Sequence, residues 1–255
     1  MILQDFTRTK IYVDKIKTKI PNSYSSYPDD LPYFTNKMGV QIWRNSDGLS
    51  LQFSGKLFAT PTTLGAITIE NADQIAEVIE EKTNVKIDLN YLLKEAPIYE
   101  VHLKIDIYTD EEKIEDYISD IREVAKAETD KYDVYRYDDV VYEKGLQVLS
   151  KPSSLAIVPK AKKNERFAIY IKGAEIRASE DREYRQQLDH GFLVQTDRIL
   201  RFELQLRSFD AMRKFCGIRI EYTPCLMDIL KSDKHPVYNK FCELIDNEKE
   251  VNDED

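Results

Sequence analysis

The chain has 255 residues, of which 42% are hydrophobic, and a formal net charge of −9. This length and composition predict a globular protein with a sizeable core, built as one large domain or two closely joined smaller ones. No apolar run approaches the roughly 20 residues that a membrane-spanning helix needs, and the opening MILQDFTRTKIYVDK lacks the apolar stretch of a secretory signal. We therefore expect a cytoplasmic protein with no membrane partner.

The acidity argues against a protein that coats nucleic acid, because nonspecific affinity comes mainly from Lys and Arg. Residues 246–255 hold six acids and one lysine, so −5 of the −9 lies in this tail, which we expect to be disordered. The three cysteines Cys216, Cys225 and Cys242 lack paired spacing, which favours neither a disulfide framework nor a zinc site. We interpret them as reduced structural thiols.

The N-terminal half predicts several strands followed by a helix. Alternating apolar positions predict a strand that stops at Pro21, and 40–44 and 49–54 predict a hairpin joined by the turn sequence NSDG. Apolar residues at helical spacing then predict a helix with Asn71 as its N-cap and an end near Asn84.

The second half predicts strands that alternate with helices. The strands are expected at 101–108, 132–142, 146–149, 166–172 and 199–207. The helices are expected at 114–125, at 174–188 and after Ser208, which suits an N-cap position.

This order of elements predicts an α+β fold with mainly antiparallel sheets and helices packed on one face. The halves look faintly alike, which suggests a pseudo-duplicated strand-helix unit. We expect an N-terminal α+β half at 1–96, a catalytic α+β half at 97–220, and a C-terminal extension at 221–255 that ends in the acidic tail.

Three of the predicted strands carry charged or phenolic groups opposite an apolar face, because side chains alternate along a strand. These groups are Lys104 and Asp106, then Tyr170 and Lys172, then Arg201, Glu203, Gln205 and Arg207. If the strands are neighbours, the groups form one surface, and Glu175 follows one turn later.

Carboxylate oxygens are hard ligands that suit Mg²⁺ or Mn²⁺, and such an ion can orient a phosphodiester. A tyrosine nearby could attack phosphorus and form a phosphotyrosine ester, with Lys172 assisting. The chain holds sixteen tyrosines, however, and packing is the commoner role of a tyrosine. Lys160, Lys162 and Lys163 precede the tyrosine strand and form either a solvated loop or a phosphate-contacting one.

The motifs occur in an order that suggests a family. Tyr-x-Lys-x-x-Glu at Tyr170, Lys172 and Glu175, Lys-Ile-Asp ending at Asp106, and Leu-Arg-Phe-Glu ending at Glu203 follow the order found in the replication initiators of filamentous phages, the gene II protein family. The chain resembles a short member of this family over about residues 49–217. More distantly it resembles the initiators of rolling-circle plasmids.

The resemblance implies a rolling-circle replication initiator. Such an enzyme nicks one strand at a double-stranded origin, holds the 5′ phosphate on a tyrosine and releases the 3′ hydroxyl to a polymerase. It implies that Tyr170 is the nucleophile, that Lys172 assists it, and that Asp106, Glu175 and Glu203 bind Mg²⁺ or Mn²⁺. Arg201 is implied to hold a phosphate or to orient a carboxylate. The implied DNA-contacting residues are Lys104, Arg201, Arg207, Lys160, Lys162 and Lys163.

The implied partners are origin DNA, in double-stranded and single-stranded form, and the host helicase and polymerase, while a homodimer is left open. One departure from many rolling-circle nucleases is the lack of a His-hydrophobic-His pair. His102 is either a metal ligand or, as we favour, a histidine that lies at the surface or has its hydrogen bonds satisfied within the protein. The alternative to an enzyme is a non-enzymatic nucleic-acid-binding or interaction protein of a phage or mobile element.

Overall fold

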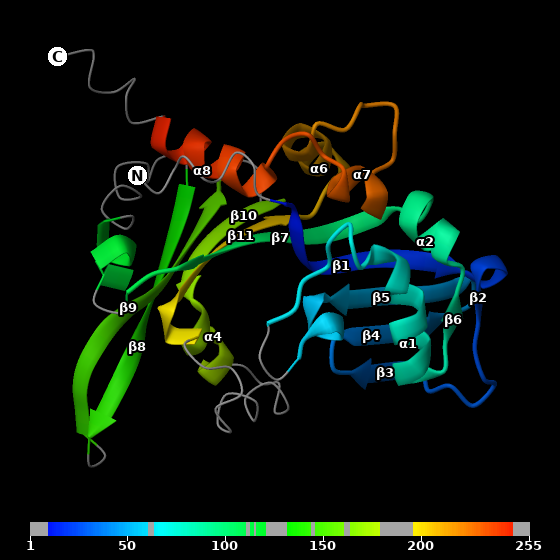
Figure 1. Cartoon of the computed structure of the whole chain (residues 1–255), viewed down its shortest axis with the longest axis horizontal. Coiled ribbons are helices and arrows are strands. Elements are labelled where there is room, and N and C mark those ends of the chain that lie inside the picture. Colours follow the sequence, from blue (N-terminus) through cyan, green and yellow to red (C-terminus); the bar gives the residue numbers. More distant parts are fainter. Residues whose placement is uncertain are drawn as a thin grey trace. The chain divides into compact units, whose positions relative to one another are not determined.

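The protein is described from a computed structural model, which covers residues 10–60, 64–110, 113–114, 116–120, 132–143, 146–160, 164–178 and 196–246. The chain divides into two compact units: unit 1 is Met1–Leu103 with Gln205–Tyr238, and unit 2 is Lys104–Leu204 with Asn239–Asp255. Strand β7 (Ile98–Tyr108) passes from unit 1 into unit 2, and β11 (Ile199–Leu206) returns (Figure 1). Each unit contains strands and helices, and the predicted α+β class with antiparallel pairing is confirmed.

Unit 1 contains most of the short strands. Its strands are β1 Tyr12–Pro21, β2 Ser25–Ser26, β3 Phe34–Lys37, β4 Val40–Asn45, β5 Gly48–Ser54 and β6 Lys86–Ile87. Its helices are α1 Ile75–Thr83, α2 Leu89–Lys94, α6 Phe209–Cys216 and α7 Leu226–Leu230, with 3-10 turns at Asn22–Tyr24, Gly55–Phe58 and Ala72–Gln74. The sheet order in this unit is β3-β4-β5-β1-β7, and β2 pairs with β6.

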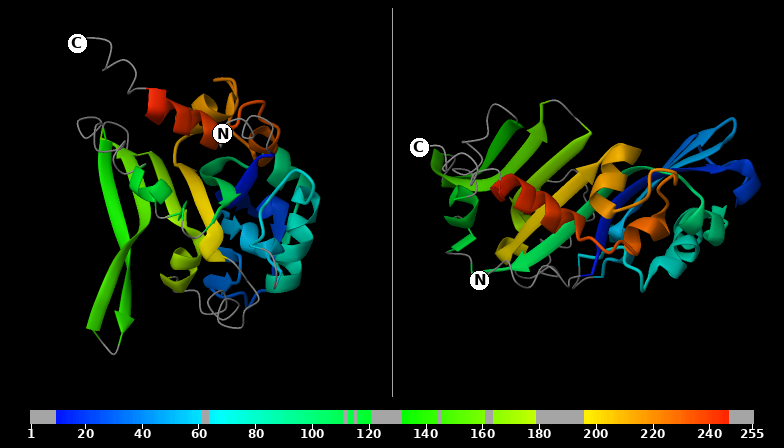
Figure 2. Two further views of the ribbon diagram at one scale, coloured as in Figure 1. Left: turned by 60° about the vertical axis from the view of Figure 1, so that its left-hand side comes forward. Right: turned by 90° about the horizontal axis from the view of Figure 1, so that it is seen from above.

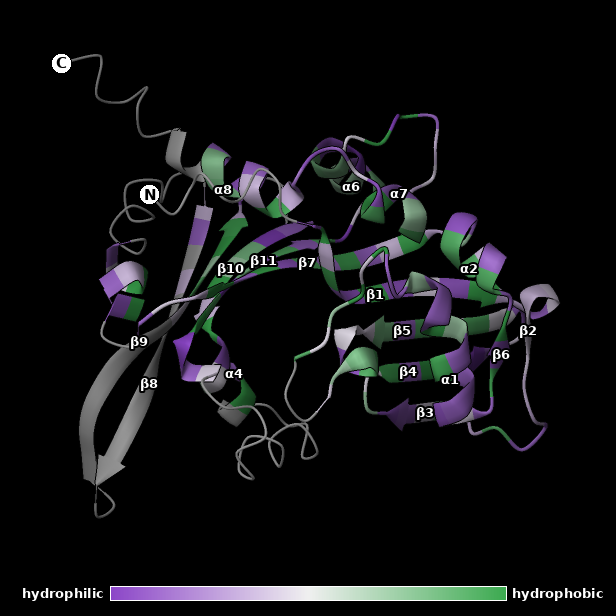
Figure 3. Ribbon diagram, viewed as in Figure 1, coloured by the Kyte–Doolittle hydropathy of each residue, from purple (hydrophilic) through white to green (hydrophobic). Residues whose placement is uncertain are grey.

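The core of unit 1 follows from the alternation of its strands. Ile42 pairs with Leu51, and Ile16 pairs with Phe53, and all four side chains are buried. Figure 3 shows the same strands banded with hydrophilic and hydrophobic residues. Helices α1 and α2 lie on one side of these strands (Figure 2, right).

The predicted NSDG hairpin is confirmed between β4 and β5. Asn45 is directly paired with Gly48, so the turn itself is Ser46–Asp47. Gly48 has φ 152°, and a Cβ there would lie 2.1 Å from the carbonyl oxygen of Ile20. Because no side chain fits so close an approach, the glycine fixes where β5 begins beside β1.

Unit 2 is built from longer strands. These are the C-terminal part of β7 from Lys104 onward, β8 Tyr132–Glu143, β9 Leu146–Pro159, β10 Glu165–Ile171 and β11 as far as Leu204. The unit also contains α4 Lys172–Ala178 and a 3-10 turn at Thr196–Arg198. The order in this unit is β7-β11-β10-β9-β8. Residues 113–114 and 116–120 are helical, as predicted, whereas 121–125 and 179–188 of the predicted helices lie outside the described residues.

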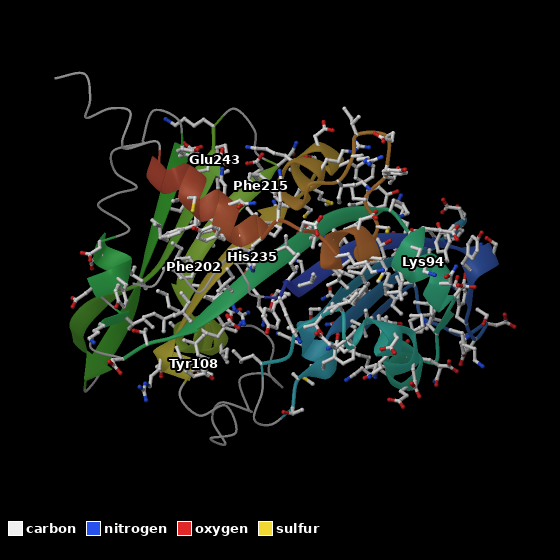
Figure 4. All side chains as sticks on the ribbon, turned by 45° about the horizontal axis from the view of Figure 1, so that its top comes forward. Lys94, Tyr108, Phe202, Phe215, His235 and Glu243 are labelled. Atoms are coloured by element: carbon white, nitrogen blue, oxygen red, sulfur yellow. The ribbon has the colours of Figure 1, made fainter. Side chains whose placement is uncertain are left out.

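Helix α8 (Pro236–Asp246) contributes Phe241 to the core of unit 2. The Phe241 ring lies 5.4 Å from that of Phe202 on β11, which Figure 4 labels, and 6.3 Å from that of Phe167 on β10. In unit 1, α7 buries Leu226 and Ile229 completely. The segment from 221 to 246 therefore packs in both units, while the acidic residues 247–255 lie outside the described part. The boundaries expected at residues 97 and 221 stay predictions.

Burial keeps the thiols of two cysteines protonated. Cys216 on α6 is 3% exposed, and burial raises the pKa of its thiol to about 12. Cys225 precedes α7, and burial together with a hydrogen bond involving Asp228 raises the pKa of its thiol to about 11. Both are therefore neutral thiols near pH 7, which suits packing and not nucleophilic attack. No helix in the described ranges is both long enough and apolar enough to cross a bilayer.

Ser208 is confirmed as the N-cap of α6, because its side-chain oxygen accepts a hydrogen bond of 3.2 Å from the amide of Ala211. Replacing Ser208 with alanine leaves that amide without its partner, and we expect about 1 kcal/mol lower free energy of unfolding. Urea titration followed by circular dichroism measures this. Ser23→Ala, at an exposed turn without a cap role, is the control. An equal loss in both variants would contradict the assignment.

Candidate functional site

The three strands expected to share a polar face are neighbours in unit 2, where β11 lies between β7 and β10. The apolar residues of β10 and β11 face α8 through Phe167 and Phe202. Because side chains alternate, Tyr170 and Glu203 lie on the opposite face. The condition set from the sequence, that these strands are neighbours, is met, with β11 and not the tyrosine strand β10 in the middle.

Asp106 is held by two cations. Arg201 donates to it with Nε at 2.5 Å from Oδ1 and Nη2 at 2.7 Å from Oδ2, and Lys104 Nζ lies 3.4 Å from Oδ2. Arg201 is 1% exposed and Lys104 is 3% exposed. Burial alone would raise the pKa of Asp106, but the charges of Arg201 and Lys104 outweigh it and hold this pKa at about 2. The carboxylate is thus ionised and rigidly oriented.

Tyr170 and Glu203 form the second contact of the site. The phenol of Tyr170 donates a hydrogen bond of 2.5 Å to Oε2 of Glu203, whose residue is 5% exposed. Lys172 Nζ lies 5.9 Å from the centre of the Tyr170 ring. A carboxylate at this distance is placed to take the phenolic proton, and a buried cation beside the ring favours negative charge on the phenol.

Lys172 is the first residue of α4, whereas the sequence predicted it at the end of the strand. Its Nζ lies 2.6 Å from Oε2 of Glu175, one helical turn later. A Cβ at Gly173 would lie 2.1 Å from Oδ1 of the Asp197 side chain and 3.0 Å from the Asp197 backbone nitrogen, so the glycine allows the turn before β11 to lie close to the start of α4. Lys172 is 3% exposed.

The three predicted metal ligands have different neighbours. Asp106 faces Arg201, Glu175 faces Lys172, and Glu203 faces Tyr170. Across the described ranges no group of three His, Cys, Asp or Glu side chains is arranged to hold an ion. Mg²⁺, however, is commonly held by one or two carboxylates, with water and substrate phosphate supplying the other oxygens. The donor chemistry fits that mode of binding and does not fit an all-protein cage, so the ligand roles stay predictions.

The predicted DNA-contacting residues lie in different environments. Lys104 and Arg201 are buried against Asp106, which is the carboxylate-orienting role that the resemblance allowed for Arg201. Lys160 is exposed at the end of β9, and Lys162 and Lys163 lie outside the described residues. Arg207 belongs to unit 1, where its half-exposed side chain lies near Glu100. Direct DNA contacts by these residues stay predictions.

Sequence reasoning missed Glu100, which lies at the centre of a basic cluster in unit 1. Its carboxylate lies 2.7 Å from His102 Nε2, 3.5 Å from Lys15 Nζ, 3.3 Å from Lys17 Nζ and 3.7 Å from Arg207 Nε. The His102 hydrogen bond and the charges of Lys15 and Lys17 outweigh burial and hold the pKa of Glu100 far below its usual range. His102 is thus a buried, satisfied histidine, as favoured from the sequence. The alternating lysines of KIKTK were the signal that could have revealed the cluster.

The chain has a distant similarity to known solved structures. No family model matches the chain, and no curated protein matches it either. Among solved structures, the rolling circle replication initiator protein from Geobacillus stearothermophilus is similar at 12% sequence identity with a TM-score of 0.39. The similarity covers 93% of this chain and 79% of that one. A likeness this distant assigns neither a family nor an activity, so membership of the initiator family stays a prediction.

Proposed function

We propose that the chain is a rolling-circle DNA replication initiator that nicks and rejoins one strand through a covalent bond to Tyr170. The observation that supports this most directly is the 2.5 Å hydrogen bond from the Tyr170 phenol to Glu203. The buried ammonium group of Lys172, 5.9 Å from the centre of the Tyr170 ring, further supports the proposal. A tyrosine that only packs also needs an acceptor for its hydroxyl, but it does not need a buried cation at its ring.

The proposed reaction is a transfer at phosphorus. Glu203 takes the phenolic proton, the oxygen of Tyr170 bonds to phosphorus, and the bond from phosphorus to the 3′ oxygen breaks. The 3′ oxygen takes up a proton, from protonated Glu203 or from water, and leaves as a hydroxyl. The net reaction thus moves the phenolic proton to the 3′ oxygen, and the 5′ phosphate remains on the tyrosine. The phosphotyrosine ester preserves the energy of the phosphodiester, and the reverse attack by a 3′ hydroxyl rejoins the strand. Lys172 stabilises the charge that develops at phosphorus.

Arg201 and Asp106 have a positioning role in this proposal. The bidentate pair ties β11 to β7 two residues before Glu203, so it orients the strand that carries the carboxylate acceptor. Hydrogen bonds such as these, which hold the strands behind the reacting groups in place, keep those groups aligned for reaction.

The proposal includes a divalent cation, Mg²⁺ or Mn²⁺, held by one or two of Asp106, Glu175 and Glu203 together with phosphate oxygens. Such an ion would neutralise negative charge on the phosphodiester. We expect nicking to fall below detection in excess EDTA and to return when Mg²⁺ or Mn²⁺ is added, as measured by the fraction of nicked DNA. Undiminished nicking in EDTA would remove the metal from the proposal while leaving Tyr170 in place.

The proposed partners are origin DNA, in double-stranded and single-stranded form, and the host helicase and polymerase that extend the released strand. Action in the host cytoplasm follows from the same role. A homodimer would allow the tyrosines of two chains to act in turn.

The experiment that tests the function uses the full chain, a pool of random-sequence single-stranded oligonucleotides, and supercoiled plasmid DNA, each with Mg²⁺ or Mn²⁺. A denaturing gel detects cut DNA and a protein band that carries DNA after heating in detergent. The random pool makes the result independent of the origin sequence. Cutting with a covalent adduct supports the proposal, whereas binding without cutting supports the non-enzymatic alternative.

A further inference from the structure

Unit 1 presents a polar sheet face opposite the side covered by α1 and α2 (Figure 2, right). Direct pairing defines two rows across it, because paired residues share a face. One row is Lys19, Ser50, Trp43 and Phe34, and the next is Lys17, Gln52, Gln41 and Asn36. Each of these eight side chains is at least partly exposed, while alternate residues of β1, β4 and β5, namely Ile16, Ile20, Ile42, Leu49, Leu51 and Phe53, are buried in the core. We call these two rows the open face.

One end of the open face is basic. Lys15, Lys17 and Lys19 alternate along β1 on this side, and Arg207 lies beside the first two through Glu100. Three of these permanent cations face a single carboxylate, that of Glu100, so positive charge remains in excess there. Lys17 and Arg207 keep 44% and 50% of their side chains exposed. The local charge is thus opposite in sign to the net charge of the chain.

The other end of the open face is aromatic. The rings of Phe34 and Trp43 are stacked, with centroids 5.2 Å apart, and Phe34 is 43% exposed although it is a large apolar side chain. Tyr33, next to it, is 71% exposed and lines a hollow of about 730 Å³ together with Lys19, Arg44, Asp47 and Ser50. Exposed rings of this kind offer flat apolar surfaces on which a planar group can stack.

We propose that the open face binds single-stranded DNA, with phosphates at Lys15, Lys17, Lys19 and Arg207 and bases stacked on Phe34 and Trp43. From β1 to β3 the face spans three strand spacings, or about 14 Å, which accommodates a few nucleotides. The glutamines and the serine between the two ends, Gln41, Gln52 and Ser50, can donate and accept hydrogen bonds with base edges. Cations that follow a backbone beside aromatic platforms are the usual means of binding single strands.

This site is separate from the Tyr170 site and does not require cutting. Only the choice of DNA over RNA rests on the proposed function. The open face would hold a nucleic-acid single strand whether or not the chain is a nickase, so failure of one proposal leaves the other measurable.

Trp43 is the single tryptophan of the chain, so its emission reports on the open face without any substitution. Titrating the full chain with oligothymidylate of about 20 nucleotides is expected to quench Trp43 fluorescence, because a stacked base quenches indole. Tyr170→Phe is expected to give the same quenching curve. Unchanged Trp43 emission at saturating oligonucleotide, or stronger quenching by duplex DNA or by oligouridylate, would overturn the inference.

Fluorescence anisotropy with the same labelled oligonucleotide tests the residues. Phe34→Ala is expected to weaken binding by roughly 5- to 100-fold through the loss of one stacking platform. Lys17→Gln with Lys19→Gln is expected to reduce the slope of log affinity against log salt by about 1.4, from about 0.7 per phosphate contact on a single strand. Lys86→Gln with Lys94→Gln removes the same charge from exposed positions of unit 1 outside the open face and is the control (Figure 4). Equal effects of the two lysine pairs would overturn the inference, and far-ultraviolet circular dichroism verifies that each variant is folded.

Discussion

Replacing Tyr170 with phenylalanine is expected to abolish the covalent protein–DNA adduct and to reduce nicking by at least about a thousandfold. The substitution removes one oxygen, which is the atom proposed to bond to phosphorus and which donates to Glu203 at 2.5 Å. The ring itself is kept, so packing against Lys172 changes little. The measurement is the yield of detergent-resistant adduct with the random oligonucleotide pool.

Tyr135→Phe is the matched control for this experiment. Tyr135 lies on β8 of the same unit and is 48% exposed, so it loses the same oxygen at a position outside the site. Wild-type adduct yield is expected for Tyr135→Phe. An adduct that persists in Tyr170→Phe would show that another residue is the nucleophile, whereas loss in both variants would point to an effect of tyrosine content on folding.

Much of the strand framework could be predicted because alternation is a local signal. The pattern of Ile199–Leu206 predicted β11, and Ser208 predicted where the next helix begins. The turn sequence NSDG predicted the hairpin between β4 and β5, whose turn ends at Gly48. In each of these cases the information lies within a few neighbouring residues, so no knowledge of the rest of the fold is needed.

The environment of the site residues could not be predicted, because it depends on pairing between distant segments. All eight residues of β11 are buried, including Arg201 and Glu203, although alternation alone predicts one solvated face. They are buried because Arg201 finds Asp106, which is 95 residues away in sequence, and Glu203 finds Tyr170. Spacing identified these residue types, but it does not say which carboxylate meets which cation. The sequence therefore suggested Glu203 as a metal ligand but did not reveal that its carboxylate accepts the hydrogen bond of the Tyr170 phenol.

The stability of unit 2 is expected to depend on the Arg201–Asp106 pair. Arg201→Met removes both hydrogen bonds and leaves the Asp106 carboxylate with the weaker support of Lys104, at 3.4 Å, and of the charge of Lys172. Breaking a buried ion pair costs about 3–5 kcal/mol, and we expect a loss toward the lower end of that range because these two cations still compensate part of the charge. The free energy of unfolding from urea titration at pH 7 measures the loss. Arg166→Met, at a residue of intermediate burial on β10, controls for removal of a guanidinium.

The pH dependence of the same pair has a defined sign. The pKa of Asp106 is about 2 in the folded chain, below its ordinary value of 3.8, so its ionisation stabilises the fold above about pH 4. That contribution, about 2 kcal/mol, is lost as the pH falls from about 4 through about 2. Asp106→Asn has no such proton to bind, so its unfolding free energy should fall less steeply with acid over that interval. Equal slopes for wild type and Asp106→Asn would show that Arg201 does not hold Asp106 ionised, and the rigid support proposed for Glu203 would fail with it.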